Sequence, residues 1–498
     1  MNAIKIIKNN FIWFVLLVFF VVFSLHSLLR YWNYNTFSWD LGLYVQQVWL
    51  YSHTFSFYNT VRGTNLLSDH FGLILYLFAP IYRLFPRAET LLIIQALLVV
   101  LSGYPIYKIA EDKLKNRFIA IVLLVAYLSS TGIRSSIDFD FHLATIAVFF
   151  YAIFLYFWLE KKYFWSIIFA ILAILTKEDM PLYIACAGLG LALINFKNKE
   201  EAKKALLLAF LSLLSFAAIY KIISVIPTTG ANINYFSFNY LGANYREVVE
   251  NLIYHPLLTI RTIWENFINN PMKINTFKTY YFGFWYLPLL SPEIIIFSIP
   301  FLLVKFVTDR DVQILLSGQY AVTGMFILTL AVIFFLYHFA KWFLKKWAKI
   351  VLNCFALVFL LFTFHYNIIS NSQFWNVADR QGWQNIKNYA GLNKMVRLIP
   401  ESASVATQDP IVSHLANREK IYLLQCPFCN TPGNRIYDYV LLDTRYGSAF
   451  APKELADIKP VINEMSQKGT LEGWGNYTLV AKDEEKDCAT YLFKNNPK

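Results

Sequence analysis

Long apolar runs separated by short polar segments dominate the chain, and this pattern predicts membrane-spanning helices. Residues 11–29 are almost entirely apolar and follow Lys5 and Lys8. This run exceeds the core of a signal peptide and precedes no small-residue cleavage site, so we expect an uncleaved anchor. Similar runs follow at about 89–107, 118–132, 143–159, 163–176, 180–196, 205–226, 284–306, 318–340 and 348–366. A shorter run at 71–86 contains Pro80.

Clusters of lysine and arginine between the runs predict which loops face the cytoplasm, because cytoplasmic loops carry an excess of these residues. The clusters lie at 108–117, 161–162, 197–204 and 341–349. With these loops inside, the N-terminus is cytoplasmic and residue 30 onward lies outside. An odd number of spans must then connect residue 30 to the first cluster. The run at 71–86 is short and broken by Pro80, so we expect it to be re-entrant or juxtamembrane.

The same parity predicts that 284–306 dips into the membrane and returns. Residues 1–366 should therefore form a transmembrane core of about nine full spans. Residues 367–498 are polar, with strand-like runs at 403–407, 421–424 and 439–443 and helix-like runs at 383–397 and 454–466. Alternating strands and helices predict a small α/β domain, which parity places outside. The expected fold class is a polytopic α-helical membrane protein with a C-terminal extracytoplasmic α/β domain.

Composition agrees with the membrane assignment. Apolar residues make up 57% of the 498 residues and charged residues only 15%, whereas a soluble domain is roughly a quarter charged. The aromatic content of 18% suits a chain with many membrane-interface positions. The formal charge of +12 comes from basic residues interleaved with the spans, so we expect no nucleic-acid partner.

Acidic residues gather in three consecutive outside segments, directly at membrane boundaries. Carboxylates beside apolar spans are costly unless they are solvated, paired or used. Their gathering on one side predicts a polar cavity that opens to the exterior. The residues concerned are Asp40, then Asp69 and His70, then Asp138, Asp140 and His142, then Glu178 and Asp179.

Each group also has a plainer interpretation. Asp40 alone could cap a helix over 41–52, which is a common role for Asp. Asp69 and His70 could share a local hydrogen bond, and 177–179 could be a self-neutralising loop. The pattern Asp-x-Asp-x-His at 138–142 could be a solvated turn, or could supply oxygen and nitrogen ligands to a divalent metal ion.

Cys426 and Cys429 form a CxxC pair in the polar C-terminal region. A zinc site would usually need two more ligands. Outside the cytoplasm, a local disulfide is the main expectation and a redox pair the alternative. The sequence contains no GxxxxGK[ST], GxGxxG or HExxH motif, so nothing supports ATP-driven transport or zinc proteolysis.

The ordered motifs resemble the bacterial and archaeal membrane proteins of domain-of-unknown-function family 2079. The motifs of the transmembrane core are WDLGLYVQQVW (39–49), LLSDHFGLILYLFAPIYRLFP (66–86), DFDFH (138–142), LTKED (175–179), NYLG (239–242), FGFWYLPLLSPEIIIFSIPFLL (282–303) and GQY (318–320). The motifs of the C-terminal region are IPESASVAT (399–407), SHLANREKIYLL (413–424) and DYVLLD (438–443).

That family is grouped with the GT-C glycosyltransferases, which use polyprenyl-phosphate sugars and act on the extracytoplasmic face. The resemblance implies that Asp40, in the first outside loop, is catalytic. Many GT-C enzymes carry paired acidic residues there, whereas this sequence has a single Asp between Trp39 and Leu41. The resemblance also implies an acidic position in the second outside loop, filled by Asp138 or Asp140.

We therefore expect a glycosyltransferase in the cytoplasmic membrane of a prokaryote, with a lipid-linked sugar donor, contacts to membrane lipid and an unspecified acceptor. Asp40 would act as the base, and Arg134 and Lys177 would stabilise the leaving phosphate. Sugar hydroxyls or a divalent metal ion would be bound by Asp69, His70, Asp138, Asp140, His142, Glu178 and Asp179. The alternatives are a transporter or flippase for a polar or lipid-linked substrate, and a sensor or scaffold. The chain shows no inverted repeat of the kind common in transporters.

Overall fold

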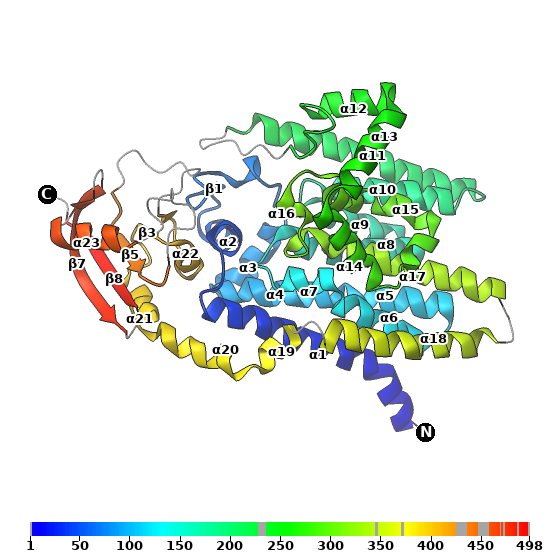
Figure 1. The fold of residues 1–498 in the computed structure, drawn as a ribbon, viewed down its shortest axis with the longest axis horizontal. Helices are drawn as coiled ribbons and strands as arrows, with labels where there is room; N and C mark the ends of the chain where they lie inside the picture. The colour runs from blue at the N-terminus through cyan, green and yellow to red at the C-terminus, as the bar shows by residue number, and fades with distance from the viewer. Residues whose placement is uncertain are drawn as a thin grey trace.

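The computed structural model describes residues 2–227, 236–343, 347–369, 373–424, 436–446, 458–468, 470–471, 474–485 and 488–496. A bundle of helices lies at one end and a domain with a β-sheet at the other (Figure 1). The expected fold class is therefore confirmed at the level of a mostly helical chain with a C-terminal sheet domain.

Within the described residues, five helical segments are long and apolar enough to cross a membrane: Asn10–Trp32, Ala88–Leu114, Lys199–Val225, Gln319–Trp342 and Ile350–Ile369. They belong to α1 (Asn2–Trp32), α4 (Ala88–Leu101) with α5 (Gly103–Leu114), α11 (Lys199–Val225), α17 (Val322–Phe343) and α18 (Ala348–Thr363). A sixth is formed if α6 (Arg117–Ser129) and α7 (Thr131–Ile137), which meet at 48°, make one span. Three shorter apolar helices follow: α8 (Leu143–Leu159), α9 (Tyr163–Ile174) and α10 (Met180–Ile194). Each predicted span coincides with one of these helices, and the crossings themselves stay a prediction.

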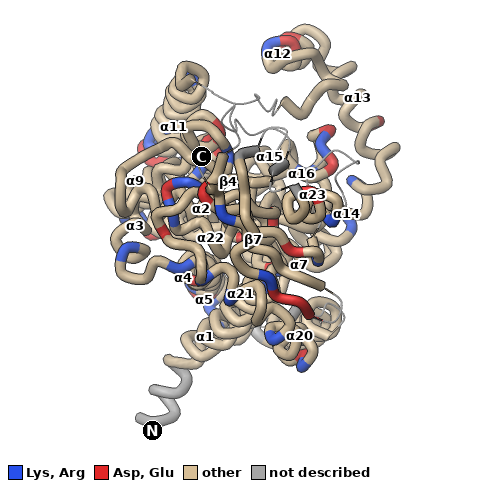
Figure 2. The backbone as a smooth tube through the Cα atoms, turned by 90° about the vertical axis from the view of Figure 1, so that its left-hand side faces the viewer, with Lys and Arg blue, Asp and Glu red and all other residues tan. Residues whose placement is uncertain are grey.

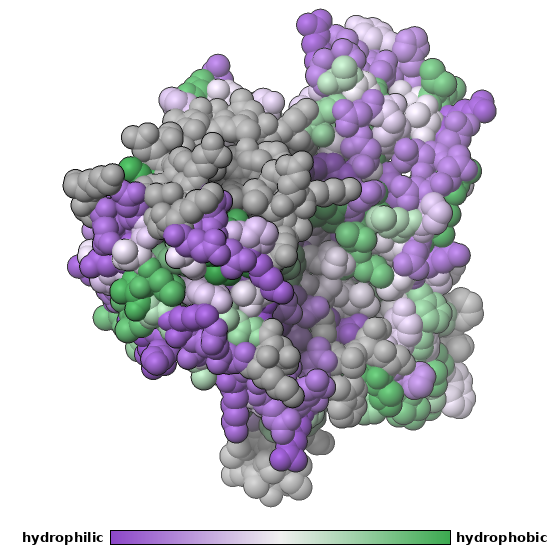
Figure 3. Space-filling model, turned by 60° about the vertical axis from the view of Figure 1, so that its left-hand side comes forward, coloured by the Kyte–Doolittle hydropathy of each residue, from purple (hydrophilic) through white to green (hydrophobic). Residues whose placement is uncertain are grey.

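The helices differ in how much of their surface the bundle covers. Eleven of the 17 residues of α8 are buried, so this helix lies in the interior. In contrast, only 17% of the most apolar stretch of α11 is buried. Exposed apolar surface on such a helix is typical of contact with lipid. On the face drawn in Figure 3, hydrophobic patches lie among hydrophilic residues on both the bundle and the C-terminal domain.

The two segments predicted not to cross are short helices. The first contains α3 (Leu75–Leu84), which has ten residues with Pro80 inside. The second contains η3 (Leu287–Leu290), α15 (Pro292–Leu302) and η4 (Leu303–Val307). The start of α15 lies near the end of α17, because Glu293 Oε1 is 2.8 Å from His338 Nε2. After α15, Lys305 Nζ lies 6.0 Å from the ring of Tyr320, just before α17 begins, so α15 runs antiparallel to α17.

The C-terminal domain contains a six-stranded sheet with the order β4-β3-β5-β8-β7-β6. The strands β3 (Val405–Thr407), β4 (Ile421–Leu423) and β5 (Tyr439–Asp443) are parallel, and they coincide with the three predicted strands. The antiparallel half consists of β6 (Thr470–Leu471), β7 (Trp474–Glu484) and β8 (Ala489–Asn495). The domain's helices are α20 (Arg380–Asn385), η7 (Ile386–Tyr389), α21 (Ala390–Leu398), α22 (Asp409–Leu415) and α23 (Lys459–Lys468).

The remaining elements connect or flank these two parts. They are η1 (Ser38–Gly42), α2 (Leu43–His53), β1 (Tyr58–Asn59), β2 (Thr64–Asn65), η2 (Leu66–Ser68), α12 (Tyr245–Tyr254), α13 (Pro256–Ile268), α14 (Pro271–Phe282), α16 (Asp311–Ile314), η5 (Gln319–Ala321), η6 (Phe364–Ile369) and α19 (Gln373–Ala378).

The C-terminal domain is docked onto the first outside segment rather than tethered beside it. The Thr60 hydroxyl donates to the carbonyl of Ile421 at 2.7 Å and accepts the Ile421 N–H at 3.0 Å, so this threonine covers the edge strand β4. The Gln46 amide nitrogen donates to the carbonyl of Glu419 at 3.0 Å. Buried residues of both parts belong to one apolar cluster.

The topology can be tested with single cysteines at two lysines. Cysteines replacing Lys162, in a predicted cytoplasmic loop, and Lys420, exposed in the C-terminal domain, should be labelled from opposite sides of the membrane. The measurement is labelling by a membrane-impermeant thiol reagent in intact cells and in inverted vesicles. The native cysteines are replaced first, and this background serves as the control. Labelling of both positions from the same side would contradict the topology.

Candidate active site

Asp40 lies on η1, a short π-helical turn between α1 and α2. Its side chain is partly exposed, and its carboxylate makes no hydrogen bond or ion pair with any residue that the structure describes. The residue before α2 is Gly42, and no side chain caps that helix, so the interpretation of Asp40 as an N-cap is wrong. The carboxylate is therefore available to a ligand.

Two buried carboxylates hold the backbone of this turn. Asp140 accepts the N–H of Phe37 at 2.6 Å and also accepts the N–H of Leu41. Asp409 accepts the N–H of Ser38 at 2.9 Å and the hydroxyl of the same serine. Because buried carboxylates are costly without such donors, each pairing fixes both partners.

Arg30, near the end of α1, supplies positive charge to the second outside loop. Its Nη1 lies 3.2 Å from Asp140 Oδ1, and its Nε lies 3.9 Å from Asp138 Oδ1. His26, one helical turn earlier, lies 2.7 Å from the same oxygen of Asp138. The solvated-turn interpretation is therefore wrong for Asp140, which is 0% exposed, whereas the Asp138 side chain is 47% exposed.

The Asp-x-Asp-x-His pattern does not converge on one point. Asp138 faces His26, Asp140 faces η1, and His142 accepts the N–H of Ala144 at 3.1 Å and so caps α8. In the described ranges of the chain, no three His, Cys, Asp or Glu side chains form a group that could hold a metal ion. The described residues thus provide no preformed set of three such ligands, and a metal ion stays a prediction.

His70 and Glu178 join the first outside segment to the third. His70 Nδ1 lies 3.2 Å from Glu178 Oε1, and the other oxygen of Glu178 accepts the N–H of Phe71 at 3.1 Å. Burial lowers the pKa of His70, but the charges of Glu178 and Asp69 outweigh it and hold that pKa above its ordinary value. Asp69 pairs with buried Arg62 at 2.9 Å, and a local Asp69–His70 hydrogen bond stays a prediction.

Lys177 lies between its two acidic neighbours. Its Nζ is 3.1 Å from Asp179 and 3.9 Å from Glu178, as the self-neutralising loop predicts, although Glu178 also binds His70. Burial lowers the pKa of Lys177, but these two carboxylates outweigh it and raise the pKa above its ordinary value. Lys177 and Tyr320 line a small pocket of about 20 Å³, enough for a water molecule.

The environment of Asp40 disfavours its ionised form. Burial and the charges of Asp140 and Asp409 raise its pKa, while His70 and Arg30 lower it, and the pKa is raised to about 8. Figure 2 views the molecule from the end that carries the C-terminal domain, and both acidic and basic positions lie around α2. The outside segments contact one another at Phe37–Asp140 and His70–Glu178, and the polar cavity that the clustering predicts stays a prediction.

Arg134, the other predicted phosphate-binding residue, is buried on α7. Its Nε donates to the carbonyl of Ser129 at 2.8 Å, and Nη2 lies 3.4 Å from the Thr131 hydroxyl. Its guanidinium thus contacts its own helical hairpin. Arg30 is among the charges that act most strongly on Asp40.

Four residues of the site were not predicted as functional: His26, Arg30, Tyr320 and Asp409. Tyr320 is part of the GQY motif, and the charges of Lys177 and Asp40 both act on it. Arg30 is a charge at the end of the first apolar run, which is a signal that sequence reasoning could have used.

Two other features lie apart from this cluster. An open hollow of about 830 Å³ is lined by Tyr240, Thr262, Glu265, Asn266, Asn269, Asn270, Pro271, Met272 and Asp311, and by none of the predicted site residues. Cys426 and Cys429 lie outside the described residues, so their disulfide stays a prediction. Cys186, Cys354 and Cys488 are free thiols.

Comparisons with known proteins give the family of the chain. No curated protein matches the sequence. Among solved structures, the chain is similar to ArnT from Cupriavidus metallidurans in the apo state, at 12% identity and a TM-score of 0.49 over 99% of this chain and 98% of that one. The family model described as a predicted membrane protein (DUF2079) matches residues 30–485. The chain therefore belongs to the DUF2079 family of predicted membrane proteins.

Proposed function

We propose that the protein is a GT-C-type membrane glycosyltransferase that moves a sugar from a polyprenyl-phosphate donor to an acceptor hydroxyl at the extracytoplasmic face. The observation that carries this proposal is the Asp40 carboxylate, which has no protein partner among the described residues although the backbone around it is held by two buried acids. Such preorganisation is typical of a catalytic group. The motif resemblance supplies the substrate class.

The proposed step is one displacement at the anomeric carbon of the donor sugar. The acceptor oxygen forms a bond to this carbon as the bond from the carbon to the phosphate oxygen breaks. The acceptor proton passes to the Asp40 carboxylate, and polyprenyl phosphate leaves. A base whose pKa lies near the working pH is well matched to this task, and the pKa of Asp40 is raised to about 8.

The leaving phosphate needs positive charge, and Lys177 is the best-placed candidate. The Lys177 side chain is 10% exposed and lines a pocket with Tyr320, on whose ring the charge of Asp40 also acts. His70 and Arg30 add positive charge around Asp40. A divalent metal ion bound through the donor phosphate is a further proposal, which the assay below includes.

Replacing Asp40 by Asn should abolish most of the transfer. Loss of a general base lowers kcat by about 10²–10⁴-fold, and folding should be kept because the carboxylate makes no hydrogen bond or ion pair with a described residue. The measurement is release of polyprenyl phosphate from a panel of polyprenyl-phosphate sugars, with and without divalent metal.

Asp112→Asn is the matched control, because Asp112 is an exposed carboxylate in a predicted cytoplasmic loop. Wild-type turnover by Asp40→Asn would exclude Asp40 as the base. If the wild-type protein neither binds nor turns over any donor, the glycosyltransferase proposal fails and the transporter becomes the better explanation.

The pH dependence of transfer should follow Asp40. Because the base must be ionised and its pKa is raised to about 8, kcat/KM should rise with pH through about 8 and be lost below it. His70→Gln removes a charge that lowers this pKa, so the rising limb of the pH profile, where kcat/KM increases, should move to higher pH. The exposed His53 on α2 offers the control, His53→Gln, which should leave the limb in place. A limb near pH 4, or one that His70→Gln does not move, would contradict this assignment.

A further inference from the structure

Asp409 lies at the position where open α/β sheets usually bind ligands. It is the first residue of α22, directly after β3, and it is 2% exposed. The chain leaves β3 toward β4 on one side and leaves β5 toward the antiparallel strands on the other. Ligands in such sheets bind at the carboxyl ends of strands where the connections diverge in this way. Here the first outside segment of the same chain contacts that edge.

The contact runs along the whole turn that carries Asp40. The Ser38 N–H and hydroxyl both donate to Asp409, and the hydroxyls of Thr36 and Ser413 are 2.8 Å apart. At the other end, a Cβ added to Gly42 would lie 2.9 Å from Val412 Cγ1, so α22 is packed closely against the backbone of η1. The glycine permits this approach, and a larger side chain would displace the helix.

Hydrogen bonds hold the backbone next to Asp409 in place. The preceding residue, Gln408, is fully buried and bonds both backbone groups of Asp443: Nε2 donates to its carbonyl at 3.0 Å and Oε1 accepts its N–H at 2.6 Å. The Arg418 guanidinium donates to the carbonyls of Pro400 and Ala403 at 3.0 and 2.9 Å. The strands and the end of α22 are thus locked together.

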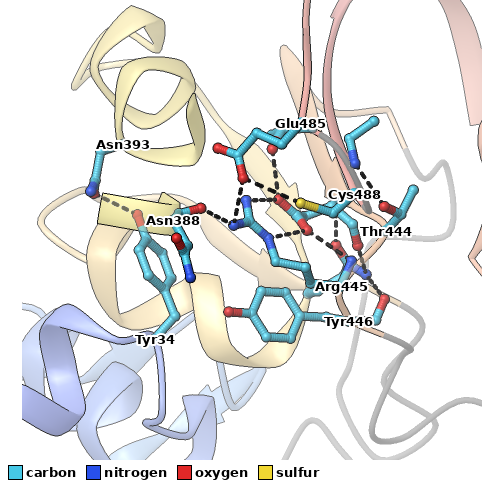
Figure 4. A network of polar contacts seen from close by, with 12 residues as sticks. Tyr34, Asn388, Asn393, Thr444, Arg445, Tyr446, Glu485 and Cys488 are labelled. Atoms are coloured by element: carbon cyan, nitrogen blue, oxygen red, sulfur yellow. Dashed lines mark hydrogen bonds and ion pairs between the residues drawn. The ribbon is translucent and has the colours of Figure 1, made fainter. Parts of the chain in front are cut away.

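A second set of contacts holds the chain just before η1. The Tyr34 hydroxyl donates to Asn393 at 2.8 Å, and the Tyr34 ring stacks on His414 with centroids 3.8 Å apart. Tyr34 also stacks on Tyr389, and the Arg445 guanidinium lies 4.8 Å from the centre of the Tyr389 ring. Figure 4 shows Tyr34 reaching Asn393 while Arg445 lies between Asn388 and Glu485.

We infer that Asp409 is a positioning residue and that the C-terminal domain acts through it to hold the Asp40 carboxylate toward the acceptor and donor. This inference rests on the proposed glycosyl transfer and assigns the C-terminal domain a part in it. The domain holds η1 from one side at Ser38, while Asp140 of the bundle holds it from the other at Phe37 and Leu41. Without Asp409, Ser38 loses its hydrogen bonds to the C-terminal domain, while the Thr36–Ser413 contact and the packing at Gly42 remain.

The first test measures the turn itself and needs no substrate. Hydrogen–deuterium exchange of the full-length protein in nanodiscs should show faster exchange of the amides of residues 37–42 in Asp409→Ala than in wild type. The control is Asp438→Ala, because Asp438 also accepts the N–H and hydroxyl of one serine, Ser404, at 2.7 and 2.8 Å. That control should leave residues 37–42 unchanged.

The second test is kinetic. A displacement of about 1 Å at the reacting groups can cost about 10²-fold in rate, so Asp409→Ala should lower kcat by about that factor. The KM for donor should change little, because Asp409 contacts the turn rather than the ligand. Asp409→Asn keeps an oxygen for Ser38 and should recover much of the loss. Ser38→Ala removes only the hydroxyl contact and should give a smaller loss.

The third readout is the pH dependence of kcat/KM. A purely structural role of Asp409 would not shift the pH at which activity rises. Asp409→Asn removes a negative charge that raises the pKa of Asp40, so the limb of the profile should move to lower pH. Asp438→Asn should not move it. The other charges facing Asp40 stay in place, namely Asp140, His70 and Arg30, together with the Tyr320 hydroxyl.

The outcomes separate this inference from the proposed function. If exchange at residues 37–42 is unchanged in Asp409→Ala, the inference is overturned, whatever the transfer assay gives. If exchange rises but the wild-type protein transfers no sugar, the holding of the turn stands and the proposed reaction fails. If Asp409→Ala does not fold, Asp409→Asn and Ser38→Ala decide, and unchanged exchange and kcat in both would overturn the inference.

Discussion

The geometry of the candidate site depends on one constraint: two buried carboxylates accept hydrogen bonds from the turn that carries a third, Asp40, at a predicted membrane boundary. Asp140 and Asp409 accept backbone N–H groups of the turn, and Arg30 lies 3.2 Å from Asp140. These donors offset the cost of burying the two acids. Asp40, whose carboxylate has no such donor in the described chain, experiences the remaining negative potential and burial, which raise its pKa to about 8.

The sequence predicts the helices and the meeting of the outside loops, because both follow from local patterns. Apolar runs mark α8 and α10, and the basic loops predict which of their ends face the cytoplasm. The parallel strands β3, β4 and β5 were also predicted from short apolar runs. The hairpin β7–β8 was not, since β7 continues through the charged residues 482–484, which local propensity does not favour in a strand.

The partners within the site could not be predicted, because they come from residues far apart in the chain. Asp409 lies 371 positions from Ser38, and nothing in DPIVSHL distinguishes a carboxylate that caps its own helix from one that reaches another domain. Likewise the Asp-x-Asp-x-His spacing suggests a shared ligand, whereas the loop backbone directs its members to His26, to η1 and to α8. The spacing of residues in a loop therefore predicts that they lie near one another, but it does not predict where their side chains point.

The single acid at positions 39–41 also has a physical reason in this fold. The next residue, Leu41, is 0% exposed, and its N–H donates to Asp140. A second acidic side chain at that position would be buried in the apolar cluster, with the charge of Asp140 close by and without a cation of its own. The second carboxylate instead comes from the loop at 138–142, where Arg30 can pair with it. Asp140 and Asp409 thus hold the turn, while the Asp40 carboxylate makes no hydrogen bond or ion pair with a described residue.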